Sequence, residues 1–493
     1  MKKNIFCYLI FAMLLQMLWQ GCSKDLGNYD YNHINDITIR YDEDTFYVRQ
    51  FDTLNIKPEV HQRIPNDASL KYQWYIYGGK IVKDEIILSN EHELNVPIPV
   101  VPYNIPYKLI FTVMDTITGV KTFHEFKVYV SNALSEGWII LEERPEGADL
   151  ALIDPSGIVL RNVYSGANNG EFLPSGAHRV FSNKSITDQN NYVLLQDDMY
   201  LIDKFDFSYL GSYPDFFYEV PEVRNPQFAA FQTTLLLPPN LVINDGDFYT
   251  YNPLLGVGKL GARISGDYKL APFMALGTST YPCVVFDQKN HRFLYLASAN
   301  ATSLTAFIPT QTPVQPFDLN DIQRKLLVLD KGASNQATAI FKNYHNDSCF
   351  LYNINPSTTN HSLVATKYQP MHDCPDVHRA VGYAMSWSLP FIYYAVDNKV
   401  YLYDIGANNA RLVYSFPAGE NITSFQMEHV SVGFWIPATP NENKRLVIAT
   451  RTGNSGSVYY LQLANTGDVE NNTYTHKFEG FGPIKALAYK VRS

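Results

Sequence analysis

The segment KVYLYD at residues 399–404 has six relatives elsewhere in the chain. Each is a short hydrophobic run, often with Tyr, that usually follows a polar turn and ends at or near Asp or Asn. The other copies are DLALID (149–154), DMYLID (198–203), DFYTYN (247–252), RFLYLAS (292–298), CFLYNIN (349–355) and SVYYLQ (457–462). Their last residues lie 49, 49, 46, 57, 49 and 58 positions apart. A period near 50 built from strands is typical of a β-propeller, so seven copies predict a seven-bladed propeller over residues 137–493.

A second group of strand-like segments is rich in small and apolar residues. Its members are PQFAAFQ (226–232), YPCVVFD (281–287), ATAIFKN (337–343), ITSFQME (422–428) and IKALAYK (484–490). Small side chains suit inner strands, where the blades of a propeller crowd around its axis. We expect IKALAYK to pair with GWIILEE (137–143) and so to protect two sheet edges. The alternative is a series of unrelated sandwiches.

The composition of the 493-residue chain fits a large all-β protein. Hydrophobic residues make up 46% and charged residues 18%, and the aromatic residues include 35 Tyr and 29 Phe, which favour strands. The net charge of −9 would repel a phosphate backbone, which argues against a nucleic-acid partner. No motif for a cofactor was found, so none is expected.

Residues 30–132 have the length and the short strands of an immunoglobulin-like β-sandwich. In YKLIFTVMD (107–115) and FKVYV (126–130) alternate positions are hydrophobic, and DTITG (115–119) supplies a turn between them. This pattern predicts a hairpin. Trp74 lies in the middle of YQWYIYGGK (72–80), where it is expected to be the central packing residue of the sandwich core.

The N-terminus has the features of a targeting segment. Lys2 and Lys3 precede a short apolar run at 5–19, and Gly21 precedes Cys22. A basic start and an apolar core too short to span a bilayer comfortably predict a signal peptide at 1–21. The Gly–Cys pair resembles a bacterial lipobox, which implies a lipidated Cys22 that begins a tether at 22–29. Ordinary secretion with a chance cysteine is the alternative.

Together, the lipobox, CSKDLGNYDYN (22–32), the sandwich and the repeats resemble the PKD-like family lipoproteins of Bacteroidota. The YKLIFTVMDTITGV hairpin itself is similar to PKD-type domains, and Lys24 and Asp25 resemble a surface-export signal. The resemblance implies an outer-membrane, lipid-anchored protein that faces the cell exterior. It also implies an accessory role beside a SusC/SusD-type importer, binding oligosaccharide or oligopeptide. A surface propeller enzyme, such as a glycosidase or lyase, and a purely structural subunit are the alternatives.

An aromatic loop is the predicted contact site for a ligand or partner. Tyr213, Phe216, Phe217 and Tyr218 lie between Pro214 and Pro221. Flat side chains offer large apolar area with few rotamers to restrict on binding. The same rings could instead pack in the protein interior, because large aromatic residues usually do.

Two other kinds of chemistry have weaker support. His372, Asp376 and His378 in MHDCPDVH (371–378) are zinc-type ligands, but their spacing matches no established zinc pattern, and a solvated loop is the alternative.

Catalysis of glycoside cleavage needs two carboxyl groups about 5–10 Å apart across a pocket. Glu142 and Glu143 are adjacent and face opposite sides of a strand, so they cannot form that pair. No catalytic residues are predicted, and a non-catalytic protein is favoured.

Lipidation can be tested directly. Cells that express the protein with a radioactive fatty acid should incorporate the label, and Cys22→Ala should abolish it, because the thioether forms on that sulfur. Cys7→Ala, a matched substitution within the signal peptide, should leave labelling intact. An unlabelled, freely secreted wild-type protein would contradict the lipobox.

Overall fold

The computed structural model describes residues 35–50, 52–65, 69–78, 82–100, 102–103, 105–183, 190–231, 240–251, 259–277, 283–298, 300–308, 314–355, 364–430 and 438–492. Cys22 and the predicted signal peptide and tether lie outside these ranges. The chain divides into two compact units, Met1–Val130 and Ser131–Ser493. Within the described ranges, no helix is long and apolar enough to cross a membrane.

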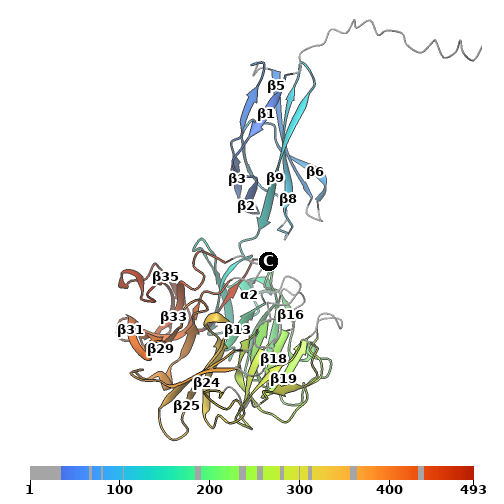
Figure 1. The fold of residues 1–493 in the computed structure, drawn as a ribbon. Coiled ribbons are helices and arrows are strands. Elements are labelled where there is room, and N and C mark those ends of the chain that lie inside the picture. The colour runs from blue at the N-terminus through green and yellow to red at the C-terminus, as the bar shows by residue number, and fades with distance from the viewer. Residues whose placement is uncertain are drawn as a thin grey trace, which may run out of the picture. The chain divides into compact units, whose positions relative to one another are not determined.

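The N-terminal unit is built from strands (Figure 1). They are β1 (Ile37–Arg40), β2 (Thr45–Arg49), β3 (Thr53–Ile56), β4 (Glu59–Gln62), β5 (Leu70–Gly78), β6 (Val82–Ser89), β7 (Leu94–Pro97), β8 (Tyr107–Asp115) and β9 (Lys121–Ser131). The main sheet has the order β2-β9-β8-β5-β6, and two smaller sheets pair β1 with β4 and β3 with β7. The predicted hairpin is confirmed: β8 pairs antiparallel with β9, and Gly119 N–H donates to Asp115 O across the turn at 2.8 Å.

Trp74 is the centre of this unit's core, as predicted. Its side chain is fully buried and stacks on Phe111 with ring centroids 4.3 Å apart. Its indole Nε1 donates to the carbonyl of Glu91 at 3.0 Å. The ring therefore buries its apolar body while its one polar atom keeps a hydrogen bond.

The described part of the C-terminal unit contains seven antiparallel sheets. The first joins β36 (Ile484–Lys490), β10 (Gly137–Arg144), β11 (Gly147–Ile153) and β12 (Val159–Leu160); the second has β13 (Arg179–Ser182), β14 (Asn190–Leu194), β15 (Met199–Asp203) and β16 (Tyr209–Gly211); the third has β17 (Pro226–Phe231), β18 (Asn240–Asn244) and β19 (Asp247–Tyr251). The fourth has β20 (Leu270–Leu276), β21 (Cys283–Asp287), β22 (Arg292–Leu296) and β23 (Leu304–Ala306); the fifth has β24 (Lys325–Lys331), β25 (Ala337–Lys342), β26 (Cys349–Ile354) and β27 (Ala365–Pro370). The sixth has β28 (Gly382–Met385), β29 (Phe391–Val396), β30 (Lys399–Asp404) and β31 (Asn409–Ser415); the seventh has β32 (Asn421–Met427), β33 (Arg445–Thr452), β34 (Ser455–Gln462) and β35 (His476–Phe481).

Each copy of the repeated motif forms the third strand of a separate sheet. The copies are β11, β15, β19, β22, β26, β30 and β34. Helix in the described residues is confined to α2 (Val163–Ala167) and the 3-10 turns η2 (Tyr213–Phe216), η3 (Ala333–Asn335), η5 (Val377–Arg379) and η6 (Glu470–Asn472). The prediction of an all-β chain is therefore confirmed.

The sheets follow one another through contacts near their first strands. Contacting pairs are β36 with β13, β14 with β17, β17 with β20, β20 with β24, β24 with β28, β28 with β32, and β32 with β36. Three of the small-residue segments, β17, β32 and β36, begin their sheets as predicted. The prediction is wrong for β21 and β25, which are second strands; second strands are buried on both faces here and also need compact apolar residues.

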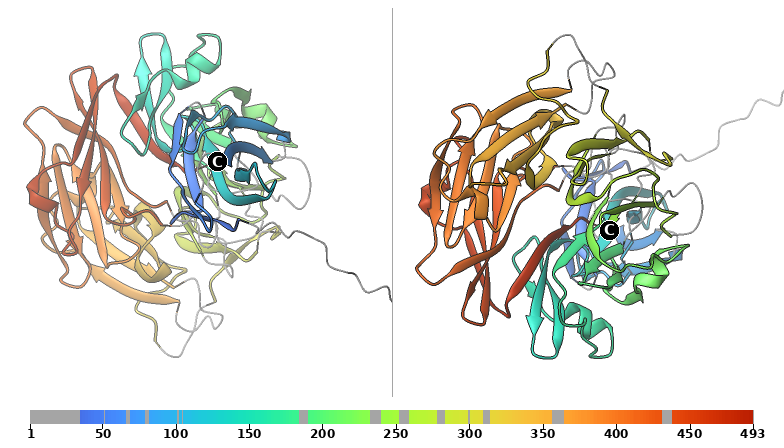
Figure 2. Two further views of the ribbon diagram at one scale, coloured as in Figure 1. Left: turned by 90° about the horizontal axis from the view of Figure 1, so that it is seen from above. Right: turned by 90° about the horizontal axis from the view of Figure 1, so that it is seen from below.

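The predicted pairing of the last strand with the first sheet is confirmed. β36 runs antiparallel to β10, with Gly137 opposite Lys490 and Leu141 opposite Ala486. In Figure 2 the red strand near the end of the chain lies beside the teal strands that begin this unit. The pairing is reinforced by side chains, since the Tyr489 hydroxyl donates to Glu136 at 2.8 Å and Lys490 Nζ donates to the Ser135 carbonyl at 2.6 Å.

The pairing of β36 with β10 requires a residue without a side chain at position 137, where the chain has Gly137. Its φ is +144°, and an added Cβ would lie 2.3 Å from the Ile153 carbonyl oxygen.

Gly137→Ala should lower the free energy of unfolding of this unit by roughly 3–5 kcal/mol, since it adds a backbone clash to backbone strain. Gly453 also has a positive φ, +60°, but nothing lies near its missing Cβ, so Gly453→Ala should cost only about 1–2 kcal/mol. Denaturant unfolding followed by fluorescence measures both; equal losses would contradict the clash.

Candidate functional site

A cavity of about 250 Å³ lies where the first strands of the sheets converge. All seven sheets or their immediate continuations contribute lining residues: Trp138 of β10, Ser182 of β13, Phe228 of β17, Met274 of β20, Asp330 of β24, Trp387 after β28, and Gln426 of β32. Small residues of the inner strands, Ala229, Ala230 and Ala488, also line it. Side chains this short leave open space where seven strands meet.

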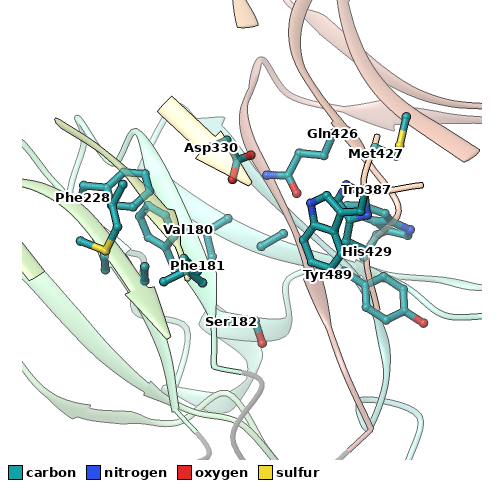
Figure 3. Close-up of a pocket in the computed structure, with 16 residues that line it drawn as sticks. Val180, Phe181, Ser182, Phe228, Asp330, Trp387, Gln426, Met427, His429 and Tyr489 are labelled. Atoms are coloured by element: carbon teal, nitrogen blue, oxygen red, sulfur yellow. The ribbon is translucent and has the colours of Figure 1, made fainter. Parts of the chain in front are cut away.

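Aromatic rings form two walls of this axial cavity. Figure 3 shows Phe181 and Phe228 on one side and Trp387 and His429 on the other. Phe181 and Phe228 make an edge-to-face pair with centroids 5.4 Å apart. Trp387 and His429 are parallel, 3.9 Å apart, with an interplanar angle of 3°.

The Trp387–His429 wall is held from several directions. His429 Nε2 lies 2.9 Å from the Met385 carbonyl, and the Trp387 backbone N–H donates to Asn443 Oδ1 at 2.8 Å. Lys331 Nζ lies 4.2 Å from the Trp387 ring centroid. Because the stacked imidazole already fills one face of the indole, the ammonium occupies the opposite face. Burial lowers the pKa of Lys331.

A buried ion pair lies beside the segment that carries His429. Glu428, next to His429, is almost fully buried and accepts a hydrogen bond from Thr439 at 2.7 Å. Its other oxygen lies 3.2 Å from Arg445 Nη1. Burial raises the pKa of Glu428. Breaking a buried pair leaves an uncompensated charge, so this contact fixes the position of the Glu428–Val430 segment.

Polar atoms are few among the residues that line the cavity. Asp330 and Gln426 lie together in Figure 3, away from Ser182. Asp330 is the one carboxylate among the described lining residues, and no Lys or Arg is among them. Trp138 Nε1, Ser182 Oγ and Trp387 Nε1 are buried and have no hydrogen-bond partner among the described residues. Trp138 and Ser182 are themselves only 2% and 8% exposed.

The described lining offers few groups that could take part in chemistry. A glycosidase needs two carboxyl groups, and the described lining supplies one. An unpaired buried donor costs about 1–3 kcal/mol, so each of these three atoms lowers the stability of the fold. The sequence analysis did not find the cavity because its residues come from segments as far apart as Trp138 and Tyr489. Trp138 and Trp387, two of only five tryptophans, were the available signal.

The aromatic loop lies elsewhere and is mostly interior. Tyr213, Phe216 and Phe217 are buried in one hydrophobic cluster with Tyr192 and Tyr249. The Tyr213 hydroxyl donates to the Val223 carbonyl at 3.3 Å, and Phe217 meets Tyr249 edge-to-face at 5.2 Å. These three rings are in the positions that the packing alternative describes. Their apolar area is already covered by the protein, so it is not available to a ligand. Only Tyr218, at 64% exposure, faces solvent.

Two of the three candidate metal ligands lie beside charged partners. His378 Nε2 lies 3.6 Å from Asp347, and Asp376 lies 3.1 Å from Arg379, while His372 is exposed. No three His, Cys, Asp or Glu side chains gather as a metal site within the described ranges.

Comparison with known proteins gives a family match in the N-terminal part of the chain. A model of the PKD-like family matches residues 22–176. No curated protein matches the chain.

Solved structures similar to the chain have low identity. A quinonprotein alcohol dehydrogenase-like protein from Bacteroides thetaiotaomicron is 13% identical with a TM-score of 0.47, over 91% of this chain and 97% of that one. A 6-phosphogluconolactonase-like protein from Bacteroides uniformis is 12% identical with a TM-score of 0.44, over 72% and 99%. The β-propeller domain of Cps50 from Myceliophteria thermophila is 7% identical with a TM-score of 0.36, over 62% and 87%. The PKD-like match covers most of the N-terminal unit and the first strands of the C-terminal unit.

The burial of the aromatic loop gives a stability prediction. Phe216→Ala with Phe217→Ala should lower the free energy of unfolding by at least about 3–5 kcal/mol, the usual cost of deleting one buried ring. Tyr218→Ala, an exposed neighbour in the same loop, should change it by less than about 0.5 kcal/mol. Thermal and denaturant unfolding measure both. A stable double mutant would mean that the rings are not core.

Proposed function

We propose that this protein is a non-catalytic binding protein whose C-terminal unit is a seven-bladed β-propeller and whose ligand occupies the axial cavity. The supporting observation for the propeller is the order of sheet contacts, which returns from β32 to β36. In such a ring each sheet is one blade, and pairing of β36 with β10 joins the last and the first strands of this unit in one blade.

The axial cavity carries the proposal for binding. It is concave, mostly apolar and has a few polar groups, which are the properties of small-molecule sites. Hydrogen bonds and stacking hold the Trp387–His429 wall, and an edge-to-face contact joins Phe181 and Phe228; walls formed before a ligand arrives reduce the entropy lost on binding. The single carboxylate among its described lining residues favours binding over the rival enzyme function.

We further propose that the protein is a lipoprotein of the Bacteroidota type, anchored by Cys22 in the outer membrane and facing the cell exterior. There it would serve as an accessory of a SusC/SusD-type importer in nutrient uptake, capturing oligosaccharide or oligopeptide. Support comes from the lipobox-like segment, from Lys24 and Asp25, and from the PKD-like match that begins at Cys22.

The importer association is tested by isolation from the native membrane. Detergent extraction of cells that express a tagged wild-type protein should yield a TonB-dependent channel and its lidding lipoprotein with it. Cys22→Ala should lose the channel, because an unanchored protein leaves the membrane; Cys7→Ala should retain it. Protease added to intact cells should degrade the wild-type protein if it faces outward.

Two outcomes would contradict this proposal. A protein recovered without any channel, or one protected from protease until the cells are lysed, is not a surface accessory. The purely structural alternative would be favoured by two results together. The channel would be recovered equally well with the Trp387→Ala variant and with wild type, and neither protein would bind a ligand of any class.

A further inference from the structure

We propose that the axial cavity takes one ring of a neutral saccharide, held between the Phe181–Phe228 and Trp387–His429 walls; this rests on the proposed binding function and names its ligand class. The neighbouring classes, anionic sugars and peptides, differ from it in charge and shape. The charges and hydrogen-bonding groups of the described lining therefore distinguish a neutral sugar from each of these two classes.

The size and walls of the cavity favour a single ring. At about 250 Å³ it is smaller than the roughly 300–1,000 Å³ of sites for drug-sized ligands. A pyranose has two faces of C–H groups, which pack on aromatic rings, and its hydroxyls project from the edge. Half-buried Phe181 and Phe228 offer such a surface, while on the other side of the cavity the indole of Trp387 is already covered by His429 and by Lys331 and therefore bounds the space without offering a free ring face.

The polar groups match the edge of a sugar. Trp138 Nε1 and Trp387 Nε1 can only donate hydrogen bonds, and both lack a partner among the described residues. Ser182 Oγ can donate and accept, and Asp330 and Gln426 supply acceptors. Sugar hydroxyls both donate and accept, so one ring can satisfy both kinds of group.

The charges argue against an anionic ligand. The described lining has one carboxylate and no Lys or Arg. The nearest cations are engaged with the walls themselves: Lys331 lies over Trp387, and Arg179 lies 5.7 Å from the centroid of the Phe228 ring. A uronate, a sulfated sugar or a peptide carboxylate would be desolvated beside Asp330 without a counter-ion, which is costly.

A peptide segment fits less well than a sugar. An extended backbone of several residues is longer than this cavity. In addition, the indole N–H groups can only donate hydrogen bonds, so they cannot accept one from a peptide N–H. Peptide binding would therefore leave Trp138 Nε1 or Trp387 Nε1 unsatisfied wherever an N–H faces them. We take it as the alternative that the test must separate.

The test uses the full-length lipoprotein in detergent micelles with defined probes. Calorimetry and saturation-transfer NMR would compare neutral methyl glycosides and short neutral oligosaccharides with methyl glucuronide and with acetylated, amidated tripeptides. We expect at least one neutral sugar to bind, the glucuronide to bind at least about tenfold more weakly, and the peptides not to bind.

Variants then assign the site. Trp387→Phe keeps an aromatic wall but removes one donor, so binding of the neutral sugar should weaken about three- to tenfold. Phe228→Ala should weaken it about tenfold or more. Phe350→Ala is the matched control, because Phe350 is also half-buried beneath an arginine, Arg324 at 3.8 Å, but lies outside the cavity. Its binding should equal that of wild type, and unfolding curves show that each variant is folded.

The outcomes separate this inference from the function on which it rests. Peptide binding that is lost in Phe228→Ala overturns the saccharide class and leaves the cavity as a binding site. Sugar binding unaffected by Phe228→Ala and Trp387→Phe overturns the cavity. Equal binding of glucoside and glucuronide overturns neutrality, and no binding of any neutral sugar overturns the inference, while isolation of the importer complex judges the accessory role independently.

Discussion

Antiparallel pairing of β36 with β10 is the interaction on which the C-terminal unit depends. It joins the end of the chain to the first strand of the unit, and the Tyr489–Glu136 hydrogen bond spans 353 residues. Without β36, β10 would present an unpaired row of backbone groups along a buried face, and such groups are costly. β36 also contacts both β13 and β32, so its loss would expose the first strands of two neighbouring sheets.

The same convergence of first strands creates the cavity. Seven strand ends cannot meet at a point with full-sized side chains, and Ala229, Ala230 and Ala488 relieve the crowding. The space is then narrowed by rings that project from some of the same strands, such as Phe228 of β17 and Tyr489 of β36. A structural requirement of the fold thereby provides a concave apolar surface without a separate binding domain.

The sequence predicted the strands well because their pattern is local. Alternation in the copies ending at Asp154, Asp203 and Asp404 depends only on neighbouring residues, and each copy became the third strand of a sheet. Strand position within a sheet was harder: Ala337–Lys342 and Cys283–Asp287 have the small apolar residues of inner strands, yet both are second strands. Burial on two faces selects the same residue types in either position, so composition alone does not distinguish them.

The candidate site was harder to predict than the strands, because local sequence patterns do not show which side chains are buried or which segments meet. Aromatic rings between prolines look alike whether they face solvent or the interior, and Tyr213, Phe216 and Phe217 turned inward to cover Tyr249 and Tyr192. Trp138, Ser182 and Trp387 come together only through contacts between sheets, which no local pattern encodes.

Rigidity of the Trp387–His429 wall links the fold to its proposed use. The indole is confined between the imidazole and Lys331, and the segment that carries His429 is fixed by the buried Glu428–Arg445 pair. Retaining that pair in the interior has a desolvation cost that apolar residues would avoid, so packing alone does not account for it. Under the proposed function, a wall held in one position before binding would account for it, since a preformed aromatic surface loses little entropy when a ring is placed against it.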